Sequence, residues 1–419
     1  MHYEQLTNYQ LTTLKSRNAE GVQHHVHLAG EYLLIQIIET EMVRRNMKDI
    51  PFLQPNLVKQ KSFSHYLSKI EETRKYSNYG PLNTMFENRV LAEYFEGTGG
   101  ALTVNNATIG LMLAISGTRR KKGWYAIMPS FTFSATPLAA MWCGLQPFFI
   151  DVDEDSWCMN ESLLAEALDN LGDETAVVVP YATFGTNLDL DYYTQLHDSG
   201  IPVVIDAAPC FGSIGKQGAF SKDFPGVSVF SFHATKSFGI GEGGLLYSGN
   251  KGVIQELRRA GNFGFSEDRE SVQMGLNSKL SEYAAAIALA TLDAYPAKVQ
   301  DRQQIYEWYK EAFLSLPALK NWKLQHTEGK IAHQFMPALC PEKENSEVYI
   351  KLLAADGIEA RTYFSPACHQ QKLFSPFKRT GMPVTDSLSD RILSLPLWEG
   401  MEKEDVRRVA GVLSKGLSQ

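Results

Sequence analysis

The stretch VSVFSFHATKSFGIGEGG, residues 227–244, is the part of the sequence that best predicts the fold. Its first residues, 227–230, are mostly apolar and predict a buried strand, and Lys236 follows in the turn after it, among glycines and phenylalanines. A lysine that leaves a strand end in such surroundings is partly desolvated, which lowers the pKa of its amine. The neutral amine can attack a carbonyl, so the stretch predicts a lysine that forms a Schiff base.

A second apolar run, residues 203–205, ends in Asp206. If both runs are parallel strands, Asp206 and Lys236 lie at the same rim of a sheet. A carboxylate beside a pyridine nitrogen keeps that nitrogen protonated, which lets the ring of pyridoxal 5′-phosphate (PLP) accept an electron pair. A lone lysine in a turn is more often a solvated surface residue, and its pairing with Asp206 is what favours chemistry.

Segments with strand and helix character alternate from residue 101 onward. We expect strands at 101–104, 124–128, 147–152, 176–180 and around 203, with helices at 108–115, 134–143, 160–171 and 190–197 between them. This alternation predicts an α/β fold whose mainly parallel sheet is flanked by helices and binds ligands at the carboxyl ends of its strands. The alanine-rich run Leu280 to Pro296 predicts a long helix that links this part of the chain to a smaller domain.

Residues 104–111, VNNATIGL, lie where a predicted strand passes into a helix. Free backbone amides, small side chains and the positive end of the helix dipole suit a phosphate monoester there. As a helix start alone the stretch is ordinary, since Asn is common at N-caps. The pattern Gly239-x-Gly241-x-x-Gly244 matches the dinucleotide fingerprint in letters only, because the apolar run after it predicts a strand where the fingerprint requires a helix.

Three strings, DAA at 206–208, SFHATK at 231–236 and GEGG at 241–244, resemble the DegT/DnrJ/EryC1/StrS family of PLP-dependent nucleotide-sugar aminotransferases. The similarity extends from about Tyr76 to the last residue. It implies a fold-type I aminotransferase with a large PLP-binding domain, residues 51–292, and a smaller C-terminal α+β domain, residues 293–419. Residues 1–50 do not match the family and form an N-terminal extension of unknown role.

The resemblance also implies roles for single residues. Lys236 and Asp206 are the catalytic pair, and both also bind the cofactor. Asn277, in GLNSKLSE at 275–282, matches an asparagine that reaches the cofactor of the neighbouring subunit, which implies a homodimer with shared active sites. The other implied cofactor ligands are the phosphate-binding step Ala107 and Thr108, the second phosphate contact Ser231, and Phe133, which stacks on the pyridine ring.

Candidate substrate contacts are Tyr79, beside a Gly-Pro turn, and Tyr363 and His369 in RTYFSPACH. A plain turn before a helix explains the first segment equally well, and His369 could equally be an ordinary loop histidine. The chain departs from the family at Pro209, where a polar residue usually lies near the ring hydroxyl of PLP. That contact is absent, supplied by another residue such as Thr183, or made by water.

The activity implied is transfer of an amino group from an amino acid, glutamate in the family, to a keto group of a nucleotide-linked deoxyhexose, as in the synthesis of lipopolysaccharide or antibiotic amino sugars. A PLP-dependent sugar dehydratase on the same fold is the first alternative, and the retained Lys236 favours transamination over the dehydratase type that has histidine there. A non-enzymatic sensor derived from this fold is the second alternative, motivated by Pro209 and the unmatched first fifty residues.

Composition sets wider limits. With 419 residues the chain is long enough for two domains, and its net charge of −7 argues against nucleic acid as a partner. Five dispersed cysteines show no metal-binding spacing and predict reduced thiols in a cytoplasm, and we expect no metal site and no membrane span. His24, His25 and His27 predict a polar surface turn, and residues 28–42 predict an amphipathic helix.

Overall fold

The computed structural model describes residues 48–416, and all the elements below belong to the second of two compact units, residues 50–419. The predicted histidine turn and the helix at 28–42 lie outside the described residues, as does nearly all of the predicted extension 1–50. Within the described part, the central strands form a four-stranded sheet, β1 (Gly100–Val104), β9 (Gly244–Ser248), β8 (Val227–Ser231) and β5 (Val204–Asp206), and a three-stranded sheet, β3 (Gln146–Ile150), β2 (Tyr125–Pro129) and β4 (Thr175–Val178).

Two parallel bridges, Val178 to Val203 and Tyr181 to Asp206, join the two sheets side by side. Strands β2, β3 and β4 run parallel to one another, and β5 runs parallel to β8, whereas β9 is antiparallel to both of its neighbours. The predicted mainly parallel sheet is therefore confirmed, and β9 is the strand predicted after Gly244.

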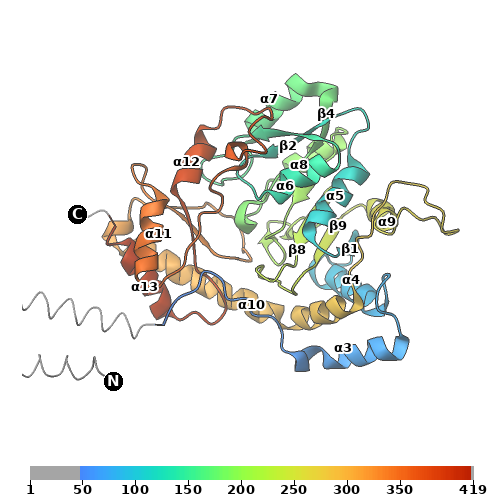
Figure 1. The fold of residues 1–419 in the computed structure, drawn as a ribbon, viewed down its shortest axis with the longest axis horizontal. Coiled ribbons are helices and arrows are strands. Elements are labelled where there is room, and N and C mark those ends of the chain that lie inside the picture. The colour runs from blue at the N-terminus through green and yellow to red at the C-terminus, as the bar shows by residue number, and fades with distance from the viewer. Residues whose placement is uncertain (1–47, 417–419) are drawn as a thin grey trace, which may run out of the picture. The chain divides into compact units, whose positions relative to one another are not determined.

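Helices cover both faces of this sheet (Figure 1). They are α5 (Ala107–Thr118), α6 (Ala135–Trp142), α7 (Glu161–Leu171), α8 (Leu190–Asp198) and α9 (Lys251–Ala260), and the first four lie close to the predicted ranges. Successive strand residues enter different cores: Ile205 packs in one hydrophobic cluster, and Val204 packs in another. A strand buried on both faces is apolar without alternation, which is the pattern that the sequence shows.

Helix α10 (Glu282–Ser315) runs along one side of the sheet and on into the C-terminal part (Figure 1). The prediction that it ends at Pro296 is wrong. Proline inside a helix removes a backbone hydrogen bond at a cost of about 3 kcal/mol. Here the turns on either side are held by buried side chains, among them Tyr295 and Arg302, and this packing carries the helix past the proline.

The C-terminal part combines helices with an antiparallel sheet of its own. The sheet joins β10 (Lys323–Leu324), β11 (Met336–Leu339) and β12 (Ile392–Leu395), and the helices are α11 (Ser346–Ala355), α12 (Pro383–Arg391) and α13 (Lys403–Leu413). A separate hydrophobic cluster includes Tyr309, Leu353 and Val409. The predicted boundary between residues 292 and 293 falls inside α10, and the division into two domains stays a prediction.

Two further helices and a hairpin lie outside these groups, and four short 3-10 helices among the described residues, Gly172–Glu174, Thr183–Gly185, Pro317–Leu319 and Cys368–Gln370, lie in the connections. Helices α3 (Gln60–Thr73) and α4 (Pro81–Tyr94) precede β1, and both pack on α10. A short hairpin, β6 (Ile214–Gly215) and β7 (Gly218–Ala219), lies between β5 and β8 in the sequence.

Candidate active site

Strand register brings the predicted catalytic pair to one rim of the sheet. Asp206, the last residue of β5, pairs with Val229 of β8, and β8 ends two residues later at Ser231. The loop after β8 folds back on itself, because the Ala234 amide donates to the Gly241 carbonyl and the Lys236 amide donates to the His233 carbonyl. Lys236 is thereby held just beyond the strand end that Asp206 flanks.

Asp206 is 3% exposed and has two internal donors. The Thr136 hydroxyl donates to its Oδ2 at 2.6 Å, and the Ala208 amide donates to its Oδ1 at 3.1 Å. Burial raises the pKa of the carboxyl above its ordinary value, while these two hydrogen bonds and the positive charge of Lys236 pull the pKa down. These two donors fix the orientation of the Asp206 carboxylate. In the PLP hypothesis, this carboxylate faces the pyridine nitrogen of the cofactor.

Lys236 is partly buried and its Nζ donates to Oε1 of Gln334 at 3.0 Å. Burial lowers the pKa of the amine, and the negative charge of Asp206 raises it. Because the charge of each group acts on the pKa of the other, Asp206 and Lys236 lie within electrostatic reach. A lysine with a lowered pKa carries a larger fraction of neutral, nucleophilic amine.

The predicted phosphate ligands also converge at this rim. Gly244 pairs with Val104 on one side and with Ser231 on the other, so the start of α5 and the end of β8 are separated by one glycine. A Cβ at Gly244 would lie 3.1 Å from the amide nitrogen of Ala107, the first residue of α5. Free amides at a helix N-terminus, with Ser231 close by, form a candidate anion cradle. Its two sides come this close only around a glycine, because a Cβ there would also lie 2.8 Å from the Phe230 carbonyl oxygen.

One buried polar atom next to this cradle is unpaired. Oδ1 of Asn105 has no hydrogen-bond partner among the described residues, although its backbone amide donates to the Ser278 carbonyl at 2.7 Å. The residues fit PLP: an acid for the ring nitrogen, an amine for the aldehyde carbon and an anion cradle for the phosphate gather at one end of the sheet.

Phe133, predicted to stack on the pyridine, has a side chain that is 57% exposed. It lies between β2 and α6, and its ring centroid is 6.4 Å from that of Phe364. Phe364 in turn contacts Tyr181, at 5.8 Å between centroids, and Tyr181 pairs with Asp206 across the sheet. The Phe133 ring is therefore largely exposed, and Phe364 and Tyr181 connect it to Asp206.

The structure narrows the alternatives for the contact that Pro209 cannot make. The hydroxyl of Thr183, named as a substitute, is buried and donates to the Trp157 carbonyl at 2.8 Å. The hydroxyl proton of Thr183 is thus already used in a hydrogen bond inside the core. The Thr183 side chain therefore does not donate a hydrogen bond to a ligand.

The three predicted substrate contacts lie in different surroundings. Tyr363 packs against Phe52, Phe335 and Phe364, so it is continuous with the aromatic group around Phe133. Tyr79 instead lies under the Arg258 guanidinium, 4.7 Å from the ring centroid, and burial raises the pKa of its phenol to about 12.

His369 is buried, and both of its ring nitrogens are engaged. Nδ1 lies 2.7 Å from the Ser130 hydroxyl and Nε2 lies 3.1 Å from Oδ1 of Asp386. Burial lowers the pKa of the imidazole. The expectation of an ordinary loop histidine does not describe this residue, and no ring nitrogen is left for a sugar hydroxyl.

Asn277, the residue predicted to reach a second subunit, is exposed. It lies in the loop between α9 and α10 and bridges to Asn262 in the same loop. The neighbouring Val272 and Met274 side chains are 56% and 88% exposed. This loop therefore presents both a polar and an apolar surface away from its own core.

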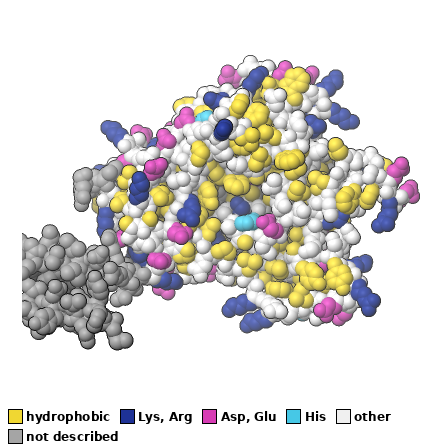
Figure 2. All heavy atoms as spheres, in the orientation of Figure 1, with side chains coloured by type: hydrophobic (Ala, Val, Ile, Leu, Met, Phe, Trp, Pro, Cys, Tyr) yellow, Lys and Arg dark blue, Asp and Glu magenta, His cyan; other side chains and the backbone are white. Residues whose placement is uncertain are grey.

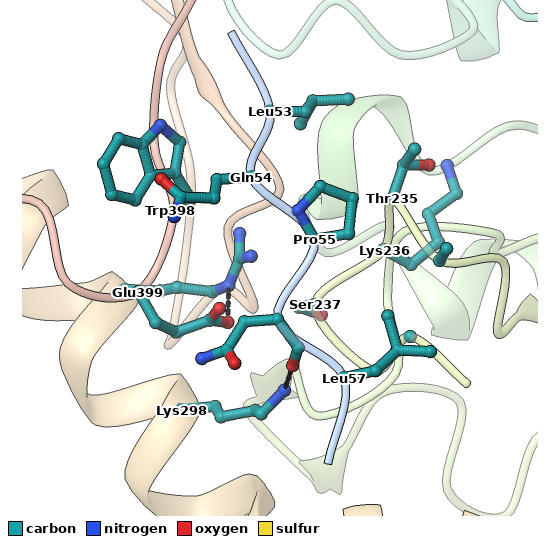
Figure 3. A pocket seen from close by; sticks show the side chains of 14 residues that line it. Leu53, Gln54, Pro55, Leu57, Thr235, Lys236, Ser237, Lys298, Trp398 and Glu399 are labelled. Atoms are coloured by element: carbon teal, nitrogen blue, oxygen red, sulfur yellow. Dashed lines mark hydrogen bonds and ion pairs between the residues drawn. The ribbon is translucent and has the colours of Figure 1, made fainter. Parts of the chain in front are cut away.

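A small pocket adjoins Lys236 and is closed by the chain from Leu53 to Leu57 (Figure 3). The figure shows this segment crossing the pocket with Trp398 and Glu399 on one side and Lys236 on the other. The Lys298 amine donates to the Asn56 carbonyl, which ties the segment to α10. The N-terminal residues of the second compact unit thus border the lysine, which the sequence analysis did not predict.

Thr136 and Gln334 contact Asp206 and Lys236 through their side chains, and the sequence did not predict either contact. Thr136 is 70 residues away from Asp206 in the chain, and Gln334 is 98 residues away from Lys236. Neither belongs to a motif that the sequence analysis used. A hydroxyl in the first turn of the helix after the Phe133 segment was the one available signal.

No helix within residues 48–416 is long and apolar enough to cross a membrane. Among those same residues no group of three histidine, cysteine or acidic side chains could hold a metal ion. Figure 2 shows acidic and basic side chains interspersed over the face drawn.

Comparison with known proteins identifies relatives along nearly the whole described chain. A family model described as the DegT/DnrJ/EryC1/StrS aminotransferase family matches residues 58–414. A solved structure of a Bacillus cereus protein, assigned to the PLP-dependent aminotransferases, is 49% identical with a TM-score of 0.86, and covers 87% of this chain and 100% of that chain.

Two further relatives carry names that include a nucleotide sugar. The solved structure of DesI with its TDP-sugar product is 30% identical with a TM-score of 0.79, and covers 88% of this chain and 93% of that chain. UDP-N-acetyl-3-dehydro-alpha-D-glucosamine 3-aminotransferase of Acidithiobacillus ferrooxidans is 30% identical over 321 residues, which are 74% of this chain and 83% of that protein.

Proposed function

The chain belongs to the DegT/DnrJ/EryC1/StrS family of PLP-dependent aminotransferases, and from this premise we propose that it aminates a keto group on a nucleotide-linked deoxyhexose. The amino group comes from an amino acid, and glutamate is the donor that we propose. The observation that carries the proposal is the convergence of Asp206, Lys236 and the N-terminus of α5 at one rim of the sheet. Such a product belongs to the synthesis of amino sugars, as found in lipopolysaccharides and antibiotics.

PLP, when bound, supplies an electron sink that makes the α-hydrogen of an attached amino acid acidic. Asp206 would hold a proton on the ring nitrogen, because its buried carboxylate is oriented by the Thr136 hydroxyl and the Ala208 amide. Lys236 would move the reacting proton between the substrate carbon and the cofactor carbon, and its Nζ is the atom that would carry the proton. The lowered pKa of Lys236 favours this role because the amine must be neutral to accept a proton.

The remaining cofactor residues bind and orient. Ala107 and Thr108 would hold the phosphate through the start of α5, with Ser231 beside them across Gly244. Phe133 would cover one face of the pyridine ring with its exposed aromatic side chain.

The substrate class rests on the relatives named above, whose names include TDP- and UDP-linked sugars. Tyr363 supports it, because its half-buried ring is continuous through Phe364 with the aromatic group at Phe133. We further propose that the protein acts as a homodimer in which Asn277 reaches the partner's cofactor, since its loop presents an exposed polar and apolar surface. The five free cysteines support a reducing, cytoplasmic location.

The amino-donor half of the reaction tests the proposed activity. PLP-loaded protein mixed with glutamate, without any sugar, should release one 2-oxoglutarate per active site and lose the visible absorbance of its bound cofactor. A panel of TDP-, UDP- and GDP-linked keto-hexoses should then restore the absorbance only with an accepted sugar. Lys236→Arg is the matched control, and it should release none. Absence of 2-oxoglutarate from the wild-type protein would contradict the proposal.

A further inference from the structure

The amine of Lys236 has a protein acceptor that the proposed reaction has not yet used. Its Nζ donates to Oε1 of Gln334 at 3.0 Å, and Gln334 is only 8% exposed. Gln334 lies just before β11, in the part of the chain after α10, whereas Lys236 lies in the loop after β8. The contact thus connects the reacting amine to the C-terminal part of the molecule.

Buried groups hold the backbone that carries Gln334. The Arg302 guanidinium of α10 donates to the carbonyl of His333 at 2.8 Å and to the carbonyl of Gln334 at 3.2 Å. Arg302 is itself paired with Glu399 at 2.5 Å, and both side chains are 5% exposed. The His333 ring stacks on Tyr306, with 3.8 Å between the ring centroids. A backbone fixed in this way keeps the Gln334 side chain within reach of the amine when the amine moves.

We propose that Gln334 is a positioning residue that receives the Lys236 amine whenever that amine is not linked to the cofactor. This inference rests on the proposed function. It deepens that function by assigning the position of the Lys236 side chain while its amine is not linked to the cofactor. A four-carbon side chain without an acceptor would sample many rotamers, and each departure from the reacting carbon would slow proton transfer.

The chemistry of the acceptor suits this role. A neutral amide oxygen accepts a hydrogen bond from the amine without adding a charge. A carboxylate at the same distance would stabilise the ammonium form and keep the proton on Nζ. Gln334 therefore orients Lys236 and leaves it able to accept the reacting proton.

The first experiment uses apoprotein, so that it does not depend on activity. Competitive labelling with an amine-reactive anhydride across a pH series, read at the Lys236 peptide by mass spectrometry, gives the pKa of Lys236. We expect Gln334→Glu to raise this pKa by about one unit or more, because a negative charge then faces the amine. Gln334→Met should lower it, because the ammonium loses its acceptor.

A matched control is available in the same region. Gln325 is also buried, but its Nε2 donates to the carbonyls of Ser156 and Thr183. Gln325→Met should leave the labelling profile of Lys236 unchanged. Thermal unfolding of all three variants separates loss of fold from loss of the contact. Superimposable Lys236 profiles for wild type, Gln334→Glu and Gln334→Met would overturn the inference.

A second measurement follows PLP uptake by apoprotein through the visible absorbance that appears when Lys236 reacts. At a pH high enough for the amine to be neutral in both proteins, Gln334→Met should react severalfold more slowly than wild type, because the amine is no longer oriented by its acceptor. The two proposals fail differently. A wild-type protein that takes up no PLP contradicts the proposed function, whereas equal rates for wild type and Gln334→Met contradict the role of Gln334 alone.

Discussion

Burial acts in opposite senses on the two ionisable residues at the centre of the site. It raises the pKa of Asp206 and lowers that of Lys236, so each group is driven toward its neutral form, while the charge of each opposes the shift in the other. A neutral lysine is ready to accept a proton. The Thr136 hydroxyl, which donates to Asp206 at 2.6 Å, favours the carboxylate form by lowering its pKa.

Replacing Thr136 by valine should therefore weaken the site while preserving its shape. Without the hydroxyl donor the pKa of Asp206 rises further, so the carboxylate is lost at a higher pH as the solution is acidified. We expect PLP to bind about tenfold or more weakly, and the acid limb of the half-reaction rate to move to higher pH. Equilibrium dialysis of PLP and a pH series with glutamate measure the two effects.

Thr291→Val is the control for this substitution. Thr291 is equally buried in α10, and its hydroxyl donates only to the Ile287 carbonyl of the same helix. It should keep wild-type PLP affinity and pH dependence. If Thr136→Val behaves like Thr291→Val, the orienting role of Thr136 is wrong.

At the level of single residues, the sequence predicted the positions of residues that lie at or just after the end of a strand. Asp206 and Lys236 were found because the carboxyl ends of neighbouring parallel strands meet at one rim. Thr136 and Gln334 were not found, because each reaches the pair from a distant segment and a lone threonine or glutamine has no characteristic spacing. The hydrogen bonds of both His369 ring nitrogens could not be predicted either, because their partners also lie in other segments of the chain.

Among the elements, the contact between α5 and the central strands depends on Gly244. A Cβ there would lie 2.8 Å from the Phe230 carbonyl oxygen and 3.1 Å from the Ala107 amide nitrogen. Gly244→Ala should cost about 1–3 kcal/mol of unfolding free energy through overpacking, and it should weaken PLP binding about tenfold by crowding the phosphate cradle. Urea unfolding and PLP titration measure these changes.

Gly411→Ala in α13 provides the contrast. No heavy atom outside the helix lies within 4 Å of the position of its Cβ, so alanine should be tolerated and should stabilise the helix by about 0.5–1 kcal/mol. PLP affinity should not change. A Gly244→Ala protein that binds PLP as tightly as Gly411→Ala would show that the cradle lies elsewhere.

The Arg302–Glu399 pair fastens α10 to the segment after β12. Both side chains are buried, so Arg302→Met leaves Glu399 as an uncompensated carboxylate and should cost about 3–5 kcal/mol in urea unfolding of the apoprotein. The solvent-exposed pair of Arg407 with Glu404 should behave differently, and Arg407→Met should cost about 1 kcal/mol or less. Equal costs for the two variants would contradict the structural role assigned to the buried pair.

The length of helix α10 could not be predicted from the sequence. Local propensity ends a helix at a proline, and the prediction stopped at Pro296 accordingly. Burial of Tyr295, Arg302 and Tyr309 on the packed face outweighs that cost, and such packing depends on segments far away in the chain. The strands and helices from β1 to β5 were predicted closely because their apolar runs are short and separated by clear turns.

For the molecule as a whole, the proposed homodimer predicts complementation between two inactive variants. If Asn277 reaches the partner's cofactor, each site needs Lys236 from one subunit and Asn277 from the other. Mixed refolding of Lys236→Ala with Asn277→Ala should then give heterodimers with one intact site, and about a quarter of wild-type activity by random pairing. Activity no higher than the sum of the two separate variants would place Asn277 in its own subunit's site or in none.

The most direct test of the account is covalent mapping of the cofactor. PLP-saturated protein is reduced with borohydride, digested, and its peptides are analysed by mass spectrometry, with Lys236→Arg as the control. We expect one pyridoxyl-modified peptide, with the modification on Lys236, and none in the control. An unmodified Lys236, or a modification fixed on another lysine, would contradict the account.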